Sequence, residues 1–130
     1  MLAGWLAGVV SLLSGCAMAE THTIPTERVG TSPKGLETVD LGSGFDSSQW
    51  RNLRMREATL QPGGSLPMHS HANRPAVAYM LQGELTVYIE GKPEPIVYRA
   101  GEYYQIYKAS HAMRNVGDVP VVFIEVDLTN

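Results

Sequence analysis

The sequence predicts a single small all-β domain, and three observations lead to this prediction. From Trp50 onward, short runs rich in Val, Ile, Tyr and Leu alternate with turn residues about every 8 to 12 positions, which is typical of an antiparallel β-sandwich or barrel. Outside the N-terminal segment, no long stretch places apolar residues at helical spacing. The chain has 130 residues, which suffices for one compact domain and not for two ordinary ones.

Successive strands are expected along this domain, separated by residues that favour turns. Pro62-Gly63-Gly64 and Gly117-Asp118 are tight-turn sequences, and residues 90–95 connect two strands as a hairpin. The strands expected from β-branched and aromatic runs are Leu53–Leu60, Ser65–Ser70, Ala76–Gln82, Glu84–Ile89, Ile96–Arg99, Glu102–Ile106, Ala112–Asn115 and Val119–Asp127.

Residues 1–19 are interpreted as an export leader, because Leu2–Leu13 is apolar, uncharged and too short to span a bilayer. Two processing hypotheses remain open. Ala17-Met18-Ala19 fits a signal peptidase site that would release a soluble protein, whereas Leu13-Ser14-Gly15-Cys16 resembles a bacterial lipobox in which Cys16 is lipidated. The first predicts a periplasmic protein and the second a membrane-anchored lipoprotein.

Residues 20–49 are predicted to form an N-terminal arm, and residues 50–130 the barrel. The arm is rich in Thr, Ser, Gly and Pro, and Val39–Leu41 is its candidate edge strand. An edge strand of this kind can pair with a second copy, so we expect a homodimer.

Composition excludes several classes of function. The chain carries 10 Lys and Arg against 13 Asp and Glu, so no basic surface for nucleic acid is expected. Cys16 is the one cysteine and lies in the leader, which leaves the domain without thiolate ligands or a thiol nucleophile. Strong metal binding therefore depends on His, Asp and Glu.

Three histidines are the candidate ligands of such a metal. His69 and His71 are two residues apart, so on a strand both imidazoles point to the same face. His111 lies just before a later predicted strand, where a neighbouring strand could bring it to the pair. His22, close to the processing site, is interpreted as a solvated residue of the arm.

These residues resemble the motifs of the cupin superfamily. Gly63, His69-Ser70-His71 and Tyr79–Leu85 are similar to its first motif, and His111-Ala-Met-Arg-Asn115 to the end of its second. The resemblance covers residues 50–128 and implies a small single-domain cupin, an RmlC-like jelly roll or double-stranded β-helix that is often dimeric. It also implies a divalent metal (Fe, Zn, Mn or Ni) held by two histidines and a glutamate of the first motif and a histidine of the second.

The sequence departs from this pattern at two places. Ala76 stands where the family has its metal-ligating glutamate, and Tyr107-Lys108-Ala109 replaces a Pro-x-Gly sequence. The resemblance therefore carries over to His69, His71 and His111 as metal ligands, but not to the carboxylate.

Three neutral histidines would leave a divalent ion its full charge and open positions, so we expect a small anionic or chelating ligand. Ala76, Ala78 and Met80 are predicted to face the metal, Arg74 to bind a substrate carboxylate, and Gln105 to orient a water or the substrate.

Several neighbouring residues have less specific expectations. Some of the tyrosines at 103, 104 and 107 are expected to wall the pocket. Glu57 is either a replacement ligand or a surface partner of Arg54 or Arg56.

Three functions are compatible with this site. The first is a non-haem iron dioxygenase, as in three-histidine members of the superfamily. The second is a zinc-dependent hydrolase, isomerase or lyase, because zinc lowers the pKa of bound water to about 7. The third is a non-catalytic module that binds a small molecule.

Overall fold

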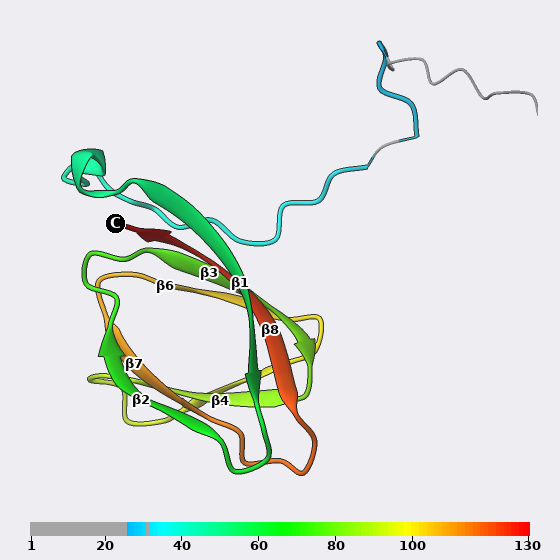
Figure 1. Cartoon of the computed structure of the whole chain (residues 1–130), viewed down its shortest axis with the longest axis vertical. Helices are drawn as coiled ribbons and strands as arrows, with labels where there is room; N and C mark the ends of the chain where they lie inside the picture. Colours follow the sequence, from blue (N-terminus) through cyan, green and yellow to red (C-terminus); the bar gives the residue numbers. More distant parts are fainter. Residues whose placement is uncertain (1–25, 31) are drawn as a thin grey trace, which may run out of the picture. The chain divides into compact units, whose positions relative to one another are not determined.

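The computed structural model describes residues 26–30 and 32–130, and Lys34–Asn130 form one compact unit (Figure 1). A short 3₁₀ turn, η1 (Ser47–Gln49), precedes the strands. The strands are β1 (Asn52–Leu60), β2 (Ser65–Ser70), β3 (Ala76–Gln82), β4 (Glu84–Ile89), β5 (Ile96–Arg99), β6 (Tyr103–Ile106), β7 (Ser110–Arg114) and β8 (Val121–Thr129).

The strands form two four-stranded antiparallel sheets that face each other. One sheet has the order β1-β8-β3-β6 and the other the order β2-β7-β4-β5. In Figure 1 the first sheet lies above the second, and the two enclose the interior of a barrel. The predicted all-β jelly roll is therefore confirmed.

The predicted strand positions agree closely with those observed. The ranges of β2, β3, β4 and β5 match the prediction residue by residue. β8 begins at Val121 instead of Val119, because Pro120 lacks the N–H that a ladder needs. β7 begins at Ser110 instead of Ala112, so His111 lies inside this strand and not before it.

The candidate edge strand Val39–Leu41 pairs with no other strand of the described residues, and its pairing with a second copy stays a prediction. Val39 and Leu41 are half-buried and line an apolar hollow with Leu53, Pro75 and Leu128, so within this chain they contribute side-chain packing instead of backbone pairing. The predicted leader and Cys16 lie outside the described residues. Among the described residues, no helix is long and apolar enough to cross a membrane.

The apolar core occupies one end of the barrel interior. Alternation along β3 turns Ala76, Ala78 and Met80 inward and Val77 and Tyr79 outward. The largest fully buried apolar side chains are Met80, Leu85, Val87, Met113 and Val121, with Phe123 beside them. This apolar floor, defined by those six residues, supports the polar half of the interior that holds the histidines.

The backbone conformation at Gly83, the end of the first motif, requires glycine. Its φ is +77°, and a Cβ there would lie 2.8 Å from the carbonyl oxygen of Pro120. Only glycine fits the tight turn from β3 to β4 at this approach.

Candidate metal centre

The three histidines converge from the paired strands β2 and β7. His69 lies in β2 and is the direct cross-strand partner of His111 in β7. His71 is one residue beyond β2, and its backbone is bonded to Lys108 and Ala109 in the loop before β7. The two-residue spacing and the strand pairing thus bring all three rings to one place.

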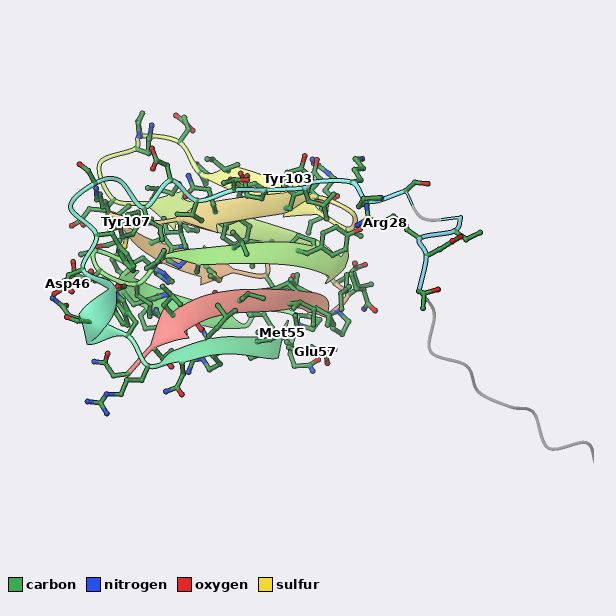
Figure 2. All side chains as sticks on the ribbon, turned by 90° about the horizontal axis from the view of Figure 1, so that it is seen from above. Arg28, Asp46, Met55, Glu57, Tyr103 and Tyr107 are labelled. Carbon is green, nitrogen blue, oxygen red and sulfur yellow. The ribbon has the colours of Figure 1, made fainter. Side chains whose placement is uncertain are left out.

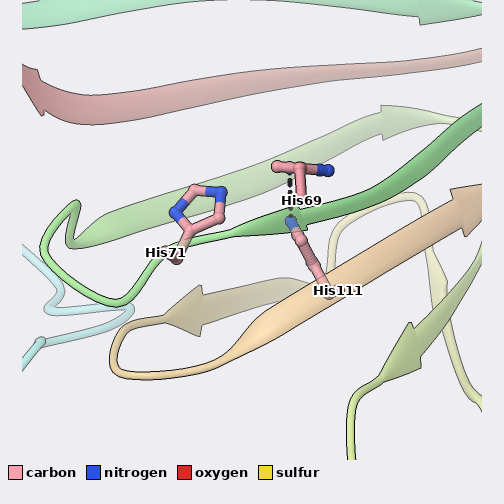
Figure 3. Close-up of side chains that lie close together, drawn as sticks. All are labelled: His69, His71 and His111. Carbon is pink, nitrogen blue, oxygen red and sulfur yellow. Dashed lines mark hydrogen bonds between the residues drawn. The ribbon is translucent and has the colours of Figure 1, made fainter.

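The ring nitrogens are close enough to share one ion. One nitrogen from each histidine lies within 4.8 Å of a nitrogen of the other two. Nε2 of His69 and Nε2 of His111 are 3.0 Å apart, as drawn by the dashed line in Figure 3. His71 and His111 are fully buried and His69 is half-buried, so the donor set opens to solvent at one side.

Backbone carbonyls fix two of the three tautomers. Nδ1 of His69 is 2.9 Å from the carbonyl oxygen of Pro67, and Nδ1 of His71 is 2.7 Å from that of Arg74. A carbonyl only accepts, so each Nδ1 carries the proton and each Nε2 carries the lone pair of its ring. A second hydrogen bond of this kind is the usual way in which proteins orient a metal-binding imidazole.

Burial keeps His71 and His111 neutral. It is the main cause that lowers the pKa of His111 to about 3, and the nearby His69, His71 and Arg74 lower that pKa further. Burial also lowers the pKa of His71, although the hydrogen bond to the Arg74 carbonyl opposes this shift. Neutral imidazoles are the form that coordinates metals, so this donor set fits a divalent transition ion.

Arg74 lies directly against the histidines. Its Nη2 is 3.0 Å from Nε2 of His71, and its Nη1 donates to Oδ2 of Asp127 at 2.8 Å. The sequence predicted Arg74 close to the candidate ligands, and its guanidinium contacts His71 in the structure. Its role in binding a substrate carboxylate stays a prediction.

Two buried carboxylates were missed by the sequence analysis. Asp127 and Glu125 of β8 are each 1% exposed. Arg54 binds Asp127 through two hydrogen bonds of 3.0 and 2.7 Å, and Arg56 binds Glu125 at 2.6 Å. The alternation of polar and apolar residues from Ile124 to Thr129 in β8 was the signal that could have placed both carboxylates on one face.

Arginine neighbours decide the charge of Asp127. Burial alone would raise the pKa of Asp127, but the hydrogen bonds from Arg54 and Arg74 outweigh it and hold this pKa below its ordinary value. Asp127 is also the cross-strand neighbour of Ala76, so a buried carboxylate stands one strand away from the position of the absent glutamate.

The predictions for Gln105 and Glu57 are wrong. Gln105 is exposed on the outer face of β6, because alternation turns Tyr104 and Ile106 inward. Glu57 is exposed on the outer face of β1 (Figure 2), so it is neither a ligand nor a partner of Arg54 or Arg56 in the described residues.

The predicted inward residues of β3 are confirmed in their direction. Ala76 and Ala78 are 3% and 4% exposed in the polar half of the interior, whereas Met80 belongs to the apolar floor. Of the three tyrosines, only Tyr104 is fully inside; Tyr103 is exposed and Tyr107 packs edge-on against Phe45.

Three buried polar atoms lack a hydrogen-bond partner among the described residues. They are Nε of Arg56, the hydroxyl of Tyr104 and Nδ1 of His111. Burial and the charge of Glu125 raise the pKa of Tyr104 above its ordinary value, so this hydroxyl keeps its proton. Unpaired buried polar atoms are rare, which fits an interior that takes up a further polar group or ion.

The family of the chain follows from its sequence match together with this fold and site. A model of the cupin domain matches residues 56–127, which is more than half of the chain. This protein therefore belongs to the cupin family.

Its relatives include enzymes named for oxalate. The chain is 32% identical over 72 residues to the oxalate decarboxylase OxdC of Bacillus subtilis (strain 168); the match covers 52% of this chain and 19% of that protein. This chain thus corresponds to about a fifth of that curated relative.

Two solved structures that are similar to this chain are also named for oxalate. A predicted oxalate decarboxylase from Thermotoga maritima superposes with a TM-score of 0.53 at 25% identity, over 64% of this chain and 70% of the other. An oxalate oxidase in complex with the substrate analogue glycolate has a TM-score of 0.52 at 28% identity, over 58% of this chain and 41% of the other.

Proposed function

We propose that this protein is a metal-dependent cupin that holds one divalent transition ion on His69, His71 and His111 and takes a small carboxylate as ligand or substrate. The observation that carries the proposal is the convergence of three neutral imidazoles from β2 and β7, with two Nε2 lone pairs fixed by backbone carbonyls. When bound, the ion supplies Lewis-acid chemistry and, if it is redox-active, electron transfer.

The charge of the interior supports an anionic ligand. Three guanidinium groups (Arg54, Arg56 and Arg74) contact two carboxylates (Glu125 and Asp127), which leaves 3 − 2 = +1 before any metal is counted. A divalent ion on neutral histidines raises this charge further. An anion compensates it, and the relatives named for oxalate and glycolate bind ligands of this class.

Two measurements test the proposal. Elemental analysis of protein purified without added metal is expected to show about one transition ion per chain. The metal-loaded protein is then titrated with oxalate and with oxamide, a neutral analogue of equal size. Tighter binding of oxalate supports the proposal, and equal affinities or an absence of metal binding contradict it.

The identity of the metal and the presence or absence of turnover distinguish the alternative functions. Iron with consumption of O₂ in the presence of a carboxylate would identify a dioxygenase-like oxidoreductase, and zinc a lyase, isomerase or hydrolase. The absence of a carboxylate at position 76 favours a second candidate, a cupin that binds a small molecule without converting it. Binding of oxalate without turnover by the metal-loaded protein would identify that module.

The wider setting of the protein is also part of the proposal. We propose that it is exported, by either of the two processing routes described for residues 1–19, and that it forms a homodimer. The outer face of the sheet β1-β8-β3-β6 supports dimerisation, because Leu53 and Met55 are 74% and 72% exposed there.

A further inference from the structure

The hydrogen bond between Arg74 and His71 has an unambiguous direction. A guanidinium group only donates, so Nη2 of Arg74 donates to Nε2 of His71 across 3.0 Å. The tautomer agrees with this direction, because Nδ1 of His71 donates to the carbonyl oxygen of the same arginine at 2.7 Å. Arg74 thus holds both nitrogens of one imidazole.

This hydrogen bond uses the electron pair that a metal ion needs. A neutral imidazole has a single ring lone pair, here on Nε2 of His71, and it cannot serve a guanidinium N–H and a metal at once. His69 is similar, since its Nε2 lies 3.0 Å from Nε2 of His111 and must accept from it. Arg74 differs from His111 in bringing a positive charge into the site.

Asp127 holds Arg74 in this position. Its Oδ2 accepts from Nη1 of Arg74 at 2.8 Å, while Arg54 binds both of its oxygens from the other side. Asp127 is fixed by Arg54 whether or not Arg74 stays. Arg74 is held less firmly by Asp127, because it donates one hydrogen bond to this carboxylate whereas Arg54 donates two.

We infer that Arg74 and a metal ion are alternative partners of His71, and that the displaced guanidinium, still anchored on Asp127, becomes the donor that receives a carboxylate ligand. The inference rests on the proposed function and adds a consequence to it. A carboxylate gives the displaced arginine a new partner, so metal and carboxylate bind with positive coupling, each tightening the other by the same factor.

The experiment measures zinc affinity by competition with a chromophoric chelator, in the presence and absence of formate, for the wild type and for Arg74→Gln. In formate-free buffer the variant is expected to bind zinc about tenfold or more tightly, because the competing charged hydrogen bond is gone. Formate is expected to tighten zinc binding by the wild type and to leave the variant nearly unchanged.

Arg56→Gln is the matched control. It removes the same charge from the same ion-pair cluster, but Arg56 donates to Glu125 and makes no hydrogen bond to a histidine of the described residues. Its gain in zinc affinity is expected to be smaller than that of Arg74→Gln, and its response to formate is expected to persist. Equal gains in the two variants, or no gain in Arg74→Gln, would overturn the inference.

The outcomes separate this inference from the proposed function. Zinc binding by the wild type with no difference in Arg74→Gln contradicts the inference alone. Zinc binding by Arg74→Gln but not by the wild type supports the inference, since Arg74 then blocks the site, and contradicts the proposed function of the natural protein.

Discussion

The two faces of the sheet β1-β8-β3-β6 differ in chemistry, and the difference is the reverse of the one expected for a small soluble barrel. Such a barrel is expected to have apolar side chains inside and charged side chains outside. On its inner side, Arg54 and Arg56 of β1 meet Glu125 and Asp127 of β8. On its outer side, which faces the viewer in Figure 2, β1 exposes Leu53 and Met55 and β8 presents Val122, Ile124, Val126 and Leu128. Charges lie inside and apolar side chains outside.

The difference shows which face serves function. Buried ion pairs rarely stabilise a fold more than apolar residues of similar volume, so the inner charges are better explained by a ligand than by stability. The outer face needs a cover instead. Leu36 and Val39 of the arm lie in hollows of this face, and a second copy of the chain would cover the rest.

The largest difference between the barrel interior and the outer surface is expected in metal affinity. His69→Ala removes one of the three converging nitrogens, and zinc affinity is expected to fall by at least about 100-fold, because even the loss of outer partners of metal ligands costs up to that factor. Gln105→Ala, on the outer face of β6, is the control and should bind zinc as the wild type does. Competition with a chromophoric chelator measures both; similar affinities would disprove the assignment of His69.

The next largest effect is expected in stability. Asp127→Ala leaves Arg54 and Arg74 without their common carboxylate, and the free energy of unfolding is expected to fall by about 2–3 kcal/mol. The loss stays below that of a fully buried pair because both arginines can turn toward solvent. Urea denaturation of the metal-free protein measures it.

Glu57→Ala on the outer face is the control for Asp127→Ala. Glu57 is exposed and takes part in no ion pair of the described residues, so its replacement should change the free energy of unfolding by less than about 0.5 kcal/mol. If both variants lose the same stability, the inner carboxylate has no special role.

Strand periodicity explains why most of the fold and the histidine site could be predicted. His69 and His71 share a face because they are two residues apart. The turn residues between the strands correctly predicted where β2, β3, β4 and β5 begin and end. Gln105 was misplaced because its sequence neighbours, Tyr104 and Ile106, gave no polar signal for the inner face. The phase of a short strand is decided by which residues its partner strands bury, and that information is not local.

The contacts around Arg74 could not be predicted from periodicity at all. Arg74 lies between strands. Its backbone carbonyl accepts a hydrogen bond from Nδ1 of His71, and its guanidinium forms an ion pair with Asp127, more than fifty residues away in sequence. Lys108 is a similar case. It takes a left-handed conformation with φ 54° in the segment that replaces the Pro-x-Gly of the family pattern, so the loop keeps a glycine-like turn without glycine.

Acid is expected to destabilise the histidine cluster in the barrel interior. The pKa of His111 is lowered from 6.5 to about 3 in the folded state, so below pH 6.5 the unfolded chain binds a proton that the folded chain does not. Stability is therefore complete above pH 6.5 and falls as the pH decreases toward 3, by about 2 kcal/mol between pH 7 and pH 5 for His111 alone. The lowered pKa of His71 acts in the same direction.

Urea denaturation of the metal-free protein at pH 7 and pH 5 measures this effect. His111→Gln lacks the titrating ring and is the matched variant; its stability should depend less on pH in this range. A wild-type stability that is equal at the two pH values would show that His111 takes up a proton in the folded protein, which would contradict its burial as a neutral imidazole.

The smallest energetic effect, and the sharpest test of the outer face, is expected from Met55→Lys. Met55 is 72% exposed on β1 beside the apolar residues of β8, so a charge there should disrupt contact between two copies while leaving the folded chain intact. Light scattering is expected to show two chains for the wild type and one for the variant, with free energies of unfolding of the separated chains within about 0.5 kcal/mol. Glu94→Gln, on the hairpin between β4 and β5, changes the net charge by the same +1 away from this face and should stay dimeric. If light scattering instead gives the mass of one chain for the wild type, the arm alone covers the apolar outer face of the sheet. The exposed apolar residues of this face are then explained without a second copy.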